Sequence, residues 1–340
     1  MKFTNTLLTL FTLFFFGSVL HAKDEKGTNT TDSSPRYLVL AASRMKTLNT
    51  ELDHAVVQGY VFAFGEPASK IIVLEKRPGE SHKYVVSDSL PRMIKDGSYK
   101  GYRILSGSFS GAEYALGGIF ESLKEDEPQP EYKVTTTVST HNLEKDIGEA
   151  SAGGFRAIAL TGLETQSALL EKLPGSEASA TSYRLLATKK VSTMEKEIAA
   201  AAAQNFKVVA ATGAGNEILV LMEKMAAGEN NRDYKVISTS RTSTFEQEIN
   251  HAAAEGYQIV PQTGAALQKG SVFMGGNYGY EQAIVMEKRP ESAQVRYRLL
   301  GAKREGTIQR ELNTTPAICS IDTMFLTYQE TVTLLRCPAN

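Results

Sequence analysis

The chain of 340 residues has no tryptophan and only two cysteines, Cys319 and Cys337, which both lie near its C-terminus. So few cysteines exclude a miniprotein held together by many disulfides. A strong charge of either sign is also missing, because 37 lysines and arginines are balanced by 38 aspartates and glutamates. This balance gives no electrostatic reason to expect a nucleic acid as partner.

Histidines are few, and the common catalytic motifs are absent from the sequence. His54 and His251 share one position of a repeat, but neither has a partner ligand at helix spacing. Gly107 to Gly111 has the glycines of a nucleophile elbow, yet Phe109 takes the place of the serine. Gly213 to Gly215 lies between two expected strands, so we interpret it as a turn rather than a dinucleotide-binding loop. We predict no catalytic, metal-binding or cofactor-binding residue and no cofactor, and we favour a protein that is not an enzyme.

Long hydrophobic runs are absent except at the N-terminus, where an apolar run over 7–16 follows Lys2 and precedes Ala22. This pattern is typical of a secretory signal, which we place at 1–22, and it predicts a secreted or periplasmic protein. The run is shorter than the roughly 20 residues of a membrane span, although an uncleaved anchor is the alternative. Residues 23–35 are rich in threonine, serine and charge and are expected to be a disordered linker. No membrane span is expected after the signal.

The rest of the chain repeats one unit about fifty residues long. In the clearest copy, Tyr234–Ser238 alternates like a strand, a helical pattern covers Thr244–Gly256, and two further strands are expected at Tyr257–Val260 and Gln282–Lys288. The predicted fold class is α+β, with six tandem βαββ repeats whose mainly antiparallel sheets each carry one helix on a face. A right-handed crossover followed by a hairpin predicts the strand order 1-3-2 in each repeat.

Three positions recur at fixed spacing. Every repeat opens with a tyrosine: Tyr37, Tyr84, Tyr132, Tyr183, Tyr234 and Tyr297. Ten residues after five of these tyrosines comes a residue expected to cap the helix: Thr47, Asn142, Thr193, Thr244 and Thr307. Twenty-two residues after four of the tyrosines comes a residue that tolerates the left-handed conformation of a helix end: Gly59, Gly154, Asn205 and Gly256. The second repeat is shorter, and Gly97 predicts a short or irregular helix there.

Segments rich in proline, glycine, serine or charge separate the repeats. The predicted boundaries are 36–80, 81–128, 129–175, 181–226, 232–291 and 295–340. One helix on a three-stranded sheet makes a small core, so neighbouring units are expected to share sheet edges or helix faces. Three pairs of units and one continuous array are both compatible with the pattern.

Four third strands end in Glu-Lys: Glu75-Lys76, Glu171-Lys172, Glu223-Lys224 and Glu287-Lys288. These charges are interpreted as solubilising strand ends, with a carboxylate-lined binding edge as the alternative. The fifth repeat also carries a glycine-rich insertion over 268–280. Five of its residues suit a binding loop: Phe273, Met274, Asn277, Tyr278 and Tyr280. The alternative is a longer hairpin whose aromatic side chains fold back onto the sheet.

The unit resembles a family of small bacterial βαββ domains of unknown function that read roughly Y-K-V … E-L … E-G-W. The matching residues are Tyr234-Lys235-Val236, Glu248-Ile249 and Glu255-Gly256-Tyr257, and in the third repeat Tyr132-Lys133-Val134 and Gly154-Phe155. Tyrosine or phenylalanine replaces the tryptophan that the family often has. The resemblance implies the βαββ fold and no activity.

The two cysteines are predicted to form a disulfide. Cys319 takes the helix-ending position of the sixth repeat, and Cys337 lies where the third strand should end. A hairpin turning at Tyr328 places them opposite each other, within disulfide distance. An oxidising compartment would preserve the bond, whereas two unpaired thiols are the alternative.

These observations favour an exported, non-enzymatic repeat protein that acts as a binding or scaffold module in the cell envelope or outside the cell. Its partner is expected to be another macromolecule or an envelope component. The alternative is an enzyme or small-ligand binder with a site between repeats, which would need titratable groups converging from two repeats.

Overall fold

The computed structural model describes residues 34–66, 70–105, 109–112, 115–162, 165–175, 181–225, 232–269, 279–289, 294–327 and 330–339. The predicted signal peptide and most of the predicted linker lie outside these ranges. All the described helices and strands lie within one compact region, Pro35–Asn340. Within the described residues, no helix is both long and apolar enough to cross a membrane.

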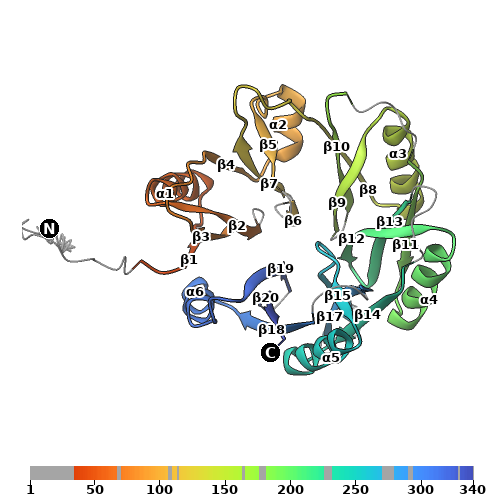
Figure 1. The fold of residues 1–340 in the computed structure, drawn as a ribbon. Helices are drawn as coiled ribbons and strands as arrows, with labels where there is room; N and C mark the ends of the chain where they lie inside the picture. The colour runs from red at the N-terminus through yellow and green to blue at the C-terminus, as the bar shows by residue number, and fades with distance from the viewer. Residues whose placement is uncertain are drawn as a thin grey trace, which may run out of the picture. The chain divides into compact units, whose positions relative to one another are not determined.

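Six units follow one another along the chain (Figure 1). Unit 1 contains β1 (Tyr37–Ala41), α1 (Met45–Val57), β2 (Tyr60–Glu66) and β3 (Ile71–Lys76). Unit 2 contains β4 (Tyr84–Ser87), α2 (Leu90–Asp96), β5 (Tyr102–Ile104), β6 (Ser110–Ala112) and β7 (Ala115–Ser122). Unit 3 contains β8 (Glu131–Thr137), α3 (Thr140–Ala152), β9 (Arg156–Gly162) and β10 (Gln166–Lys172).

Units 4 to 6 have the same order of elements. Unit 4 contains β11 (Tyr183–Thr188), α4 (Val191–Ala202), β12 (Phe206–Ala214) and β13 (Glu217–Lys224). Unit 5 contains β14 (Tyr234–Thr239), α5 (Thr242–Ala254), β15 (Tyr257–Ile259), β16 (Ala265–Lys269) and β17 (Gly279–Lys288). Unit 6 contains β18 (Val295–Ala302), α6 (Glu305–Asn313), β19 (Ser320–Leu326) and β20 (Thr331–Pro338).

Each unit forms its own antiparallel sheet, and the predicted fold class and strand order are confirmed. The last strand of every unit pairs on one side with the first strand and on the other with the second, as in the order β1-β3-β2. In units 2 and 5 a further short strand, β6 or β16, pairs with this central strand. The central strands are buried on both faces, which explains their unbroken apolar sequences such as Ile218–Met222.

The helix-ending residues have the predicted left-handed conformation. The backbone φ is 81° at Gly59, 87° at Gly154, 69° at Asn205 and 91° at Gly256. Gly97 has a φ of 73° and ends the short helix α2, as the sequence of the second repeat predicts. A single backbone conformation thus turns the chain from each of these helices toward the next strand.

We expect Gly256→Val to lower the free energy of unfolding by more than about 1 kcal/mol, because a β-branched side chain resists a positive φ. No other atom lies within 4 Å of the position that a Cβ would take, so the cost comes from backbone strain rather than a clash. Chemical denaturation measures the change. Gly256→Asn is the matched control and should be nearly neutral, since Asn205 has the same conformation in unit 4. Equal stability of the valine variant and the native protein would contradict the prediction.

The predicted helix caps are wrong by one turn. Thr47, Asn142, Thr193, Thr244 and Thr307 each form the third residue of a helix rather than the residue before it. The chain enters each of these helices directly from an extended residue, such as Arg44 with φ −121° and ψ 134°. In α3 the capping side chain is Ser139, whose hydroxyl accepts a hydrogen bond from the Asn142 backbone N–H. A small polar residue therefore marks the first turn here without capping it.

Among the described residues, every hydrophobic core cluster is shared by two units. Five of the six clusters join units that are consecutive in the chain, and the sixth joins unit 6 to unit 1. The central strand divides its side chains between two clusters. In β13, for example, Val220 faces the cluster shared with unit 5, while Leu219 and Leu221 face the one shared with unit 3. The six units therefore form one continuous array, which is one of the two predicted alternatives. Contacts between unit 6 and unit 1 close this array.

Polar side chains of one helix bind the exposed backbone edge of the next unit's first strand. Asn250 of α5 accepts a hydrogen bond from the Tyr297 N–H and donates one to its carbonyl. Asn313 of α6 makes the same pair of bonds with Tyr37. An asparagine amide thus replaces the missing neighbouring strand. Nearby, a helix residue in four units accepts from the N–H two positions after the tyrosine: Asn49 from Val86, Glu144 from Leu185, Glu246 from Leu299 and Gln309 from Val39.

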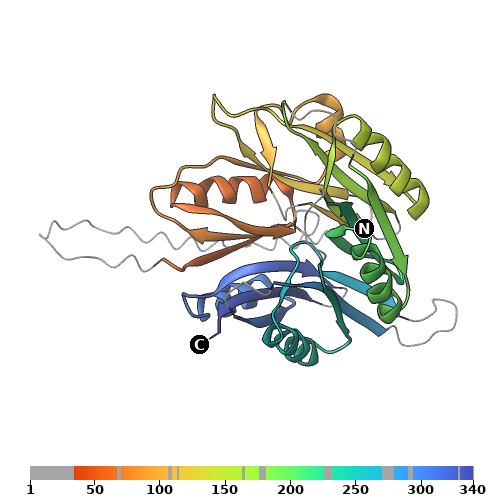
Figure 2. The ribbon, with the colours of Figure 1, turned by 45° about the vertical axis from the view of Figure 1, so that its right-hand side comes forward.

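Unit 6 and unit 1 lie side by side in both views (Figures 1 and 2). Tyr37 and Val39 of β1 pack with Ile308 and Leu312 of α6 in one buried cluster. Arg36, just before β1, also donates a hydrogen bond to the Ala317 carbonyl. Strand β1 is therefore held by α6.

Three glycines at intervals of 51 residues, Gly162, Gly213 and Gly264, allow close contact between neighbouring units. A Cβ at Gly213 would overlap the backbone of Ala266 in unit 5, and one at Gly162 would lie 3.1 Å from the Ala214 Cβ. Our interpretation of Gly213 as a turn residue is wrong, because it lies inside β12. Gly215, with φ 59°, is in the turn.

Candidate functional site

The repeated polar residues gather at the junctions between units. The hydroxyl of a leading tyrosine accepts a hydrogen bond of 2.9–3.2 Å from a backbone N–H near the start of the preceding unit's second strand. The five pairs are Phe62 with Tyr84, Ile104 with Tyr132, Ala157 with Tyr183, Val208 with Tyr234 and Ile259 with Tyr297. Burial raises the pKa to about 12 for Tyr84, Tyr183, Tyr234 and Tyr297. These phenols therefore stay neutral at physiological pH.

The glutamates of the third strands lie beside these tyrosines. Their side chains are buried to an exposed fraction of 7–8% at Glu121, Glu223 and Glu287. The repeated Glu-Lys pairs were expected at a sheet edge, either as solubilising charges or as a carboxylate-lined binding edge. Neither interpretation fits, because the third strand is the central strand of the sheet. A carboxylate at such a place requires a partner, and each of these three has an arginine.

The arginine partners come from different parts of the chain. In unit 1, Arg36 and Arg77 both bind Glu75 at 2.8 Å. Burial would raise the pKa of Glu75, but hydrogen bonds from Arg77 and Arg36 outweigh it and hold that pKa below its usual value. In contrast, Arg156 of unit 3 reaches across the junction and binds both carboxylate oxygens of Glu223 in unit 4, at 2.9 and 2.8 Å. This bidentate pair links the two units directly.

The lysine of each Glu-Lys pair serves its own unit. The Lys76 ammonium lies 4.9 Å from the centre of the Tyr60 ring and donates to the Gln58 carbonyl at the end of α1. Lys224 makes the same contacts with Phe206 and with the Gln204 carbonyl of unit 4. A cation at the carboxyl end of a helix is favourable because it neutralises the unpaired carbonyls. Lys76 and Lys224 therefore stabilise the ends of their helices.

In unit 6 a basic residue takes the place of the acidic one on the central strand, and its acidic partner lies on the second strand. Arg336 stands opposite Tyr297 in the sheet, where the other units have glutamate, and its Nε lies 3.4 Å from Asp322 on β19. Burial raises the pKa of Asp322, which has an exposed side-chain fraction of only 9%. One oxygen of this carboxylate has no hydrogen-bond partner in the described part of the chain.

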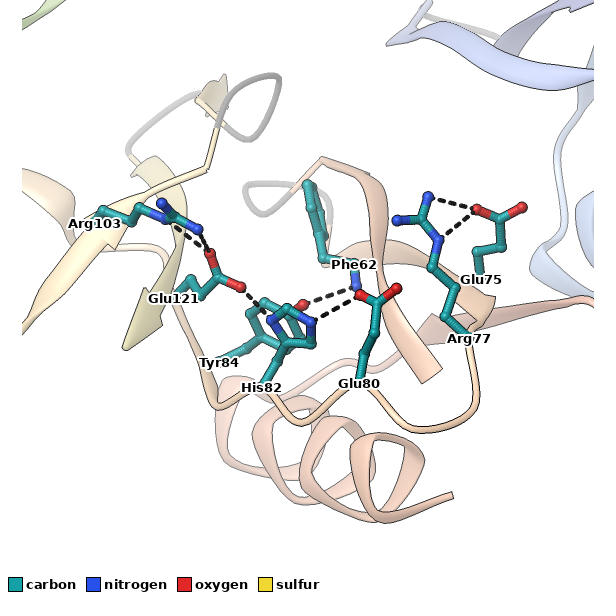
Figure 3. Close-up of polar contacts among 8 residues, drawn as sticks. All are labelled: Phe62, Glu75, Arg77, Glu80, His82, Tyr84, Arg103 and Glu121. Carbon is teal, nitrogen blue, oxygen red and sulfur yellow. Dashed lines mark hydrogen bonds and ion pairs between the residues drawn. The ribbon is translucent and has the colours of Figure 1, made fainter. Parts of the chain in front are cut away.

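Unit 2 has a histidine among its junction charges (Figure 3). His82 lies between two carboxylates, with Nδ1 2.5 Å from Glu121 and Nε2 3.1 Å from Glu80. Arg103 binds the other oxygen of Glu121, and the imidazole stacks on the Tyr84 ring at 5.6 Å. The sequence contains His82, but its spacing gave no reason to connect it with these four residues.

The predicted disulfide is present in the structure. The sulfur atoms of Cys319 and Cys337 are 2.01 Å apart and their Cα atoms 4.2 Å. Strand β19 begins at Ser320 and β20 ends at Pro338, as expected, and the hairpin turns between Thr327 and Glu330. Its predicted midpoint, Tyr328, lies outside the described residues.

The predicted binding loop is described only at its base. Phe273, Met274, Asn277 and Tyr278 lie outside the described residues, and Tyr280 is part of β17. Strands β16 and β17 continue their pairing as far as Lys269 and Gly279. The described ends of the insertion, Gln268-Lys269 and Gly279-Tyr280, therefore belong to the paired stem of β16 and β17.

His54 and His251 lie on α1 and α5, in different units. Among the described residues, no three side chains of histidine, cysteine, aspartate or glutamate come together in a way that could hold a metal ion. The junction charges bind one another, and the pair of Arg156 with Glu223 connects units 3 and 4. No protein-family model and no curated protein sequence matches the chain.

Proposed function

We propose that this protein is an exported, non-enzymatic scaffold that binds another macromolecule or an envelope component. The observation that supports this function is that the repeated charged side chains bond to one another, mostly within one unit and, for Arg156 and Glu223, across the junction of units 3 and 4. Export is supported by the N-terminal apolar run and by a disulfide, which persists in oxidising compartments. A secreted or periplasmic location is part of the same proposal.

The rival function, a small-ligand or catalytic site between repeats, needs titratable groups that converge on an open space. The described groups that converge from two units, such as Arg156 and Glu223, bond to each other instead. Binding of a large partner makes no such demand, because a surface loop can carry it.

The hairpin of unit 5 is the proposed contact region. Its sequence adds glycines and aromatic residues to a stem formed by β16 and β17. The corresponding hairpin of unit 4 closes with only Gly215 and Asn216, between Ala214 and Glu217. A unit of this fold therefore does not need the longer connection for its own sheet, which leaves the insertion for another role.

We expect that replacing residues 268–280 with Gly-Asn, the turn of unit 4, leaves the fold intact and abolishes partner binding. Leu267 and Glu281 already face each other in the sheet, so the short turn joins two paired residues. Circular dichroism and thermal unfolding test the fold, and capture from envelope extract by the immobilised mature protein tests binding.

The matched control is Asn216→Gly, which alters the unit 4 turn and should retain every captured component. Undiminished capture by the shortened variant would contradict a binding role for this hairpin. Loss of soluble expression would show that the insertion packs as part of the structure.

A further inference from the structure

The disulfide of unit 6 replaces a contact that other units make at the same place. In units 1, 4 and 5 the aromatic residue that begins the second strand lies opposite the lysine that ends the third: Tyr60 with Lys76, Phe206 with Lys224 and Tyr257 with Lys288. In unit 6, Ser320 pairs with Arg336, so the next residues outward are Cys319 and Cys337. The disulfide thus takes the place of both the ring and the lysine.

This replacement leaves one arginine of β18 without its usual partners. In unit 5, the residue after the leading tyrosine is Lys235, whose ammonium lies 4.7 Å from the centre of the Tyr257 ring and binds Glu255 beside it. The corresponding cation of unit 6 is Arg298. The ring is replaced by the disulfide, and the position of Glu255, two residues before the ring, is taken by Ala317. Arg298 therefore has neither a ring nor a carboxylate to bind.

A second arginine lies on the same face of the sheet. Arg296 is two residues before Arg298, so both side chains leave the strand on one side, and it stands opposite Cys337. Farther along this face, Leu300 packs under α6, but α6 is short and ends at Asn313. Both arginines are exposed, and neither makes a hydrogen bond or an ion pair within the described part of the chain.

Apolar residues protrude beside these arginines. Ile318, which precedes Cys319, has an exposed fraction of 62%. Pro338, which follows Cys337, is exposed as well and lies opposite the start of β18, where the C-terminus is seen in Figure 1. We call Arg296, Arg298, Ile318 and Pro338 the unit 6 patch. It combines free cations with apolar side chains on a support fixed by the disulfide.

The rest of unit 6 adds positive charge around the patch. Two of its acidic residues are occupied, because Glu330 accepts a hydrogen bond from Thr242 and Asp322 is buried beside Arg336. Glu305 and Glu311 remain. They are outnumbered by the unpaired exposed cations among the described residues of the unit: Arg296, Arg298, Lys303, Arg304 and Arg310.

We propose that the unit 6 patch docks on an anionic lipid surface. A guanidinium matches the geometry of a phosphate group, and basic residues next to exposed apolar ones are typical of peripheral contact with a bilayer. A soluble acidic polymer would use the arginines but leave Ile318 in water, which favours lipid. The inference rests on the proposed function, since it names one envelope component that the scaffold binds, but it uses a different unit from the hairpin.

Sedimentation of the mature protein with lipid vesicles tests the proposal. We expect binding to phosphatidylcholine vesicles that contain about 30% phosphatidylglycerol, no binding to phosphatidylcholine alone, and weaker binding in high salt. Replacing Arg296 and Arg298 together with glutamine should lower the partition coefficient on the order of tenfold. Ile318→Ser should lower it on the order of fivefold.

Matched controls remove the same charge or the same apolar surface elsewhere. Replacing Lys189 and Lys190 with glutamine, at the exposed start of α4, should leave vesicle binding unchanged. So should Val138→Ser, since Val138 is 77% exposed in unit 3. Circular dichroism verifies that each variant is folded, as expected for side chains that make no polar contact in their own chain.

Failure of the unmodified protein to sediment with anionic vesicles would overturn the proposal. An equal loss of binding in the lysine control would also overturn it, because binding would then depend on overall charge. Full binding by Ile318→Ser, together with equal affinity for soluble polyglutamate, would assign the patch to an acidic polymer instead. The variant with the shortened hairpin should still bind vesicles, so this test and the capture test of the proposed function fail separately.

Discussion

Replacing both Cys319 and Cys337 with alanine is expected to lower the free energy of unfolding by roughly 3 kcal/mol. The disulfide closes a segment with a sequence separation of 18 and so restricts the unfolded chain. Cys319 is also only 2% exposed and lies in the cluster that joins unit 6 to unit 1. Chemical denaturation of the oxidised protein and of the variant measures the difference.

The loss of stability should be greatest at the junction between unit 6 and unit 1. The backbone amides of Tyr37 and Val39 donate to Asn313 and Gln309. The variant should speed up hydrogen exchange of these two amides more than that of the Leu185 amide. The native protein treated with reductant is the control and should behave like the variant. Two free thiols titrating in the denatured, unreduced protein would refute the disulfide.

Gly213→Ala is expected to lower the free energy of unfolding by roughly 3 kcal/mol, although it adds a single methyl group. The new Cβ would overlap the backbone of Ala266 in the neighbouring unit, and a backbone cannot move aside as the end of a flexible side chain can. Two units would have to separate, which also strains the hydrogen bond from the Ala211 N–H to the Gln262 carbonyl.

Gly148→Ala is the matched control for this substitution and should raise the free energy of unfolding instead of lowering it. Gly148 lies on the exposed face of α3, where no other atom is within 4 Å of the position of a Cβ. Alanine in a helix interior is more stable than glycine by about 0.5–1 kcal/mol. Thermal unfolding of both variants tests the pair, and a neutral Gly213→Ala would show that the units can separate without cost.

The parts of the fold that were predicted correctly depend on positions within one unit. The spacing from Tyr234 to Gly256 identifies a helix end, because few residues other than glycine and asparagine accept that conformation. The strand order follows from the handedness of a crossover and a hairpin. The pairing of Cys319 with Cys337 follows from the symmetry of a hairpin about its turn. Each of these inferences uses local geometry alone.

The junctions could not be predicted, because they depend on which units meet. Asn250 reads as an ordinary polar residue on a helix surface until β18 lies beside it. Glu223 reads as an exposed charge at a strand end until Arg156 from another unit covers it. The sequence does contain one signal of the junctions. Gly162, Gly213 and Gly264 recur at equal intervals, as expected of a close contact repeated between units.

The bond between Tyr37 and Asn313 joins residues 276 positions apart, and this separation governs the order of folding. During synthesis the first strand emerges long before the helix that completes its edge. Until then β1 presents unpaired backbone groups, which can pair with strands of other chains. Contacts so distant in sequence also form slowly. A chain truncated before α6 would therefore keep this edge open permanently and tend to aggregate through its first unit.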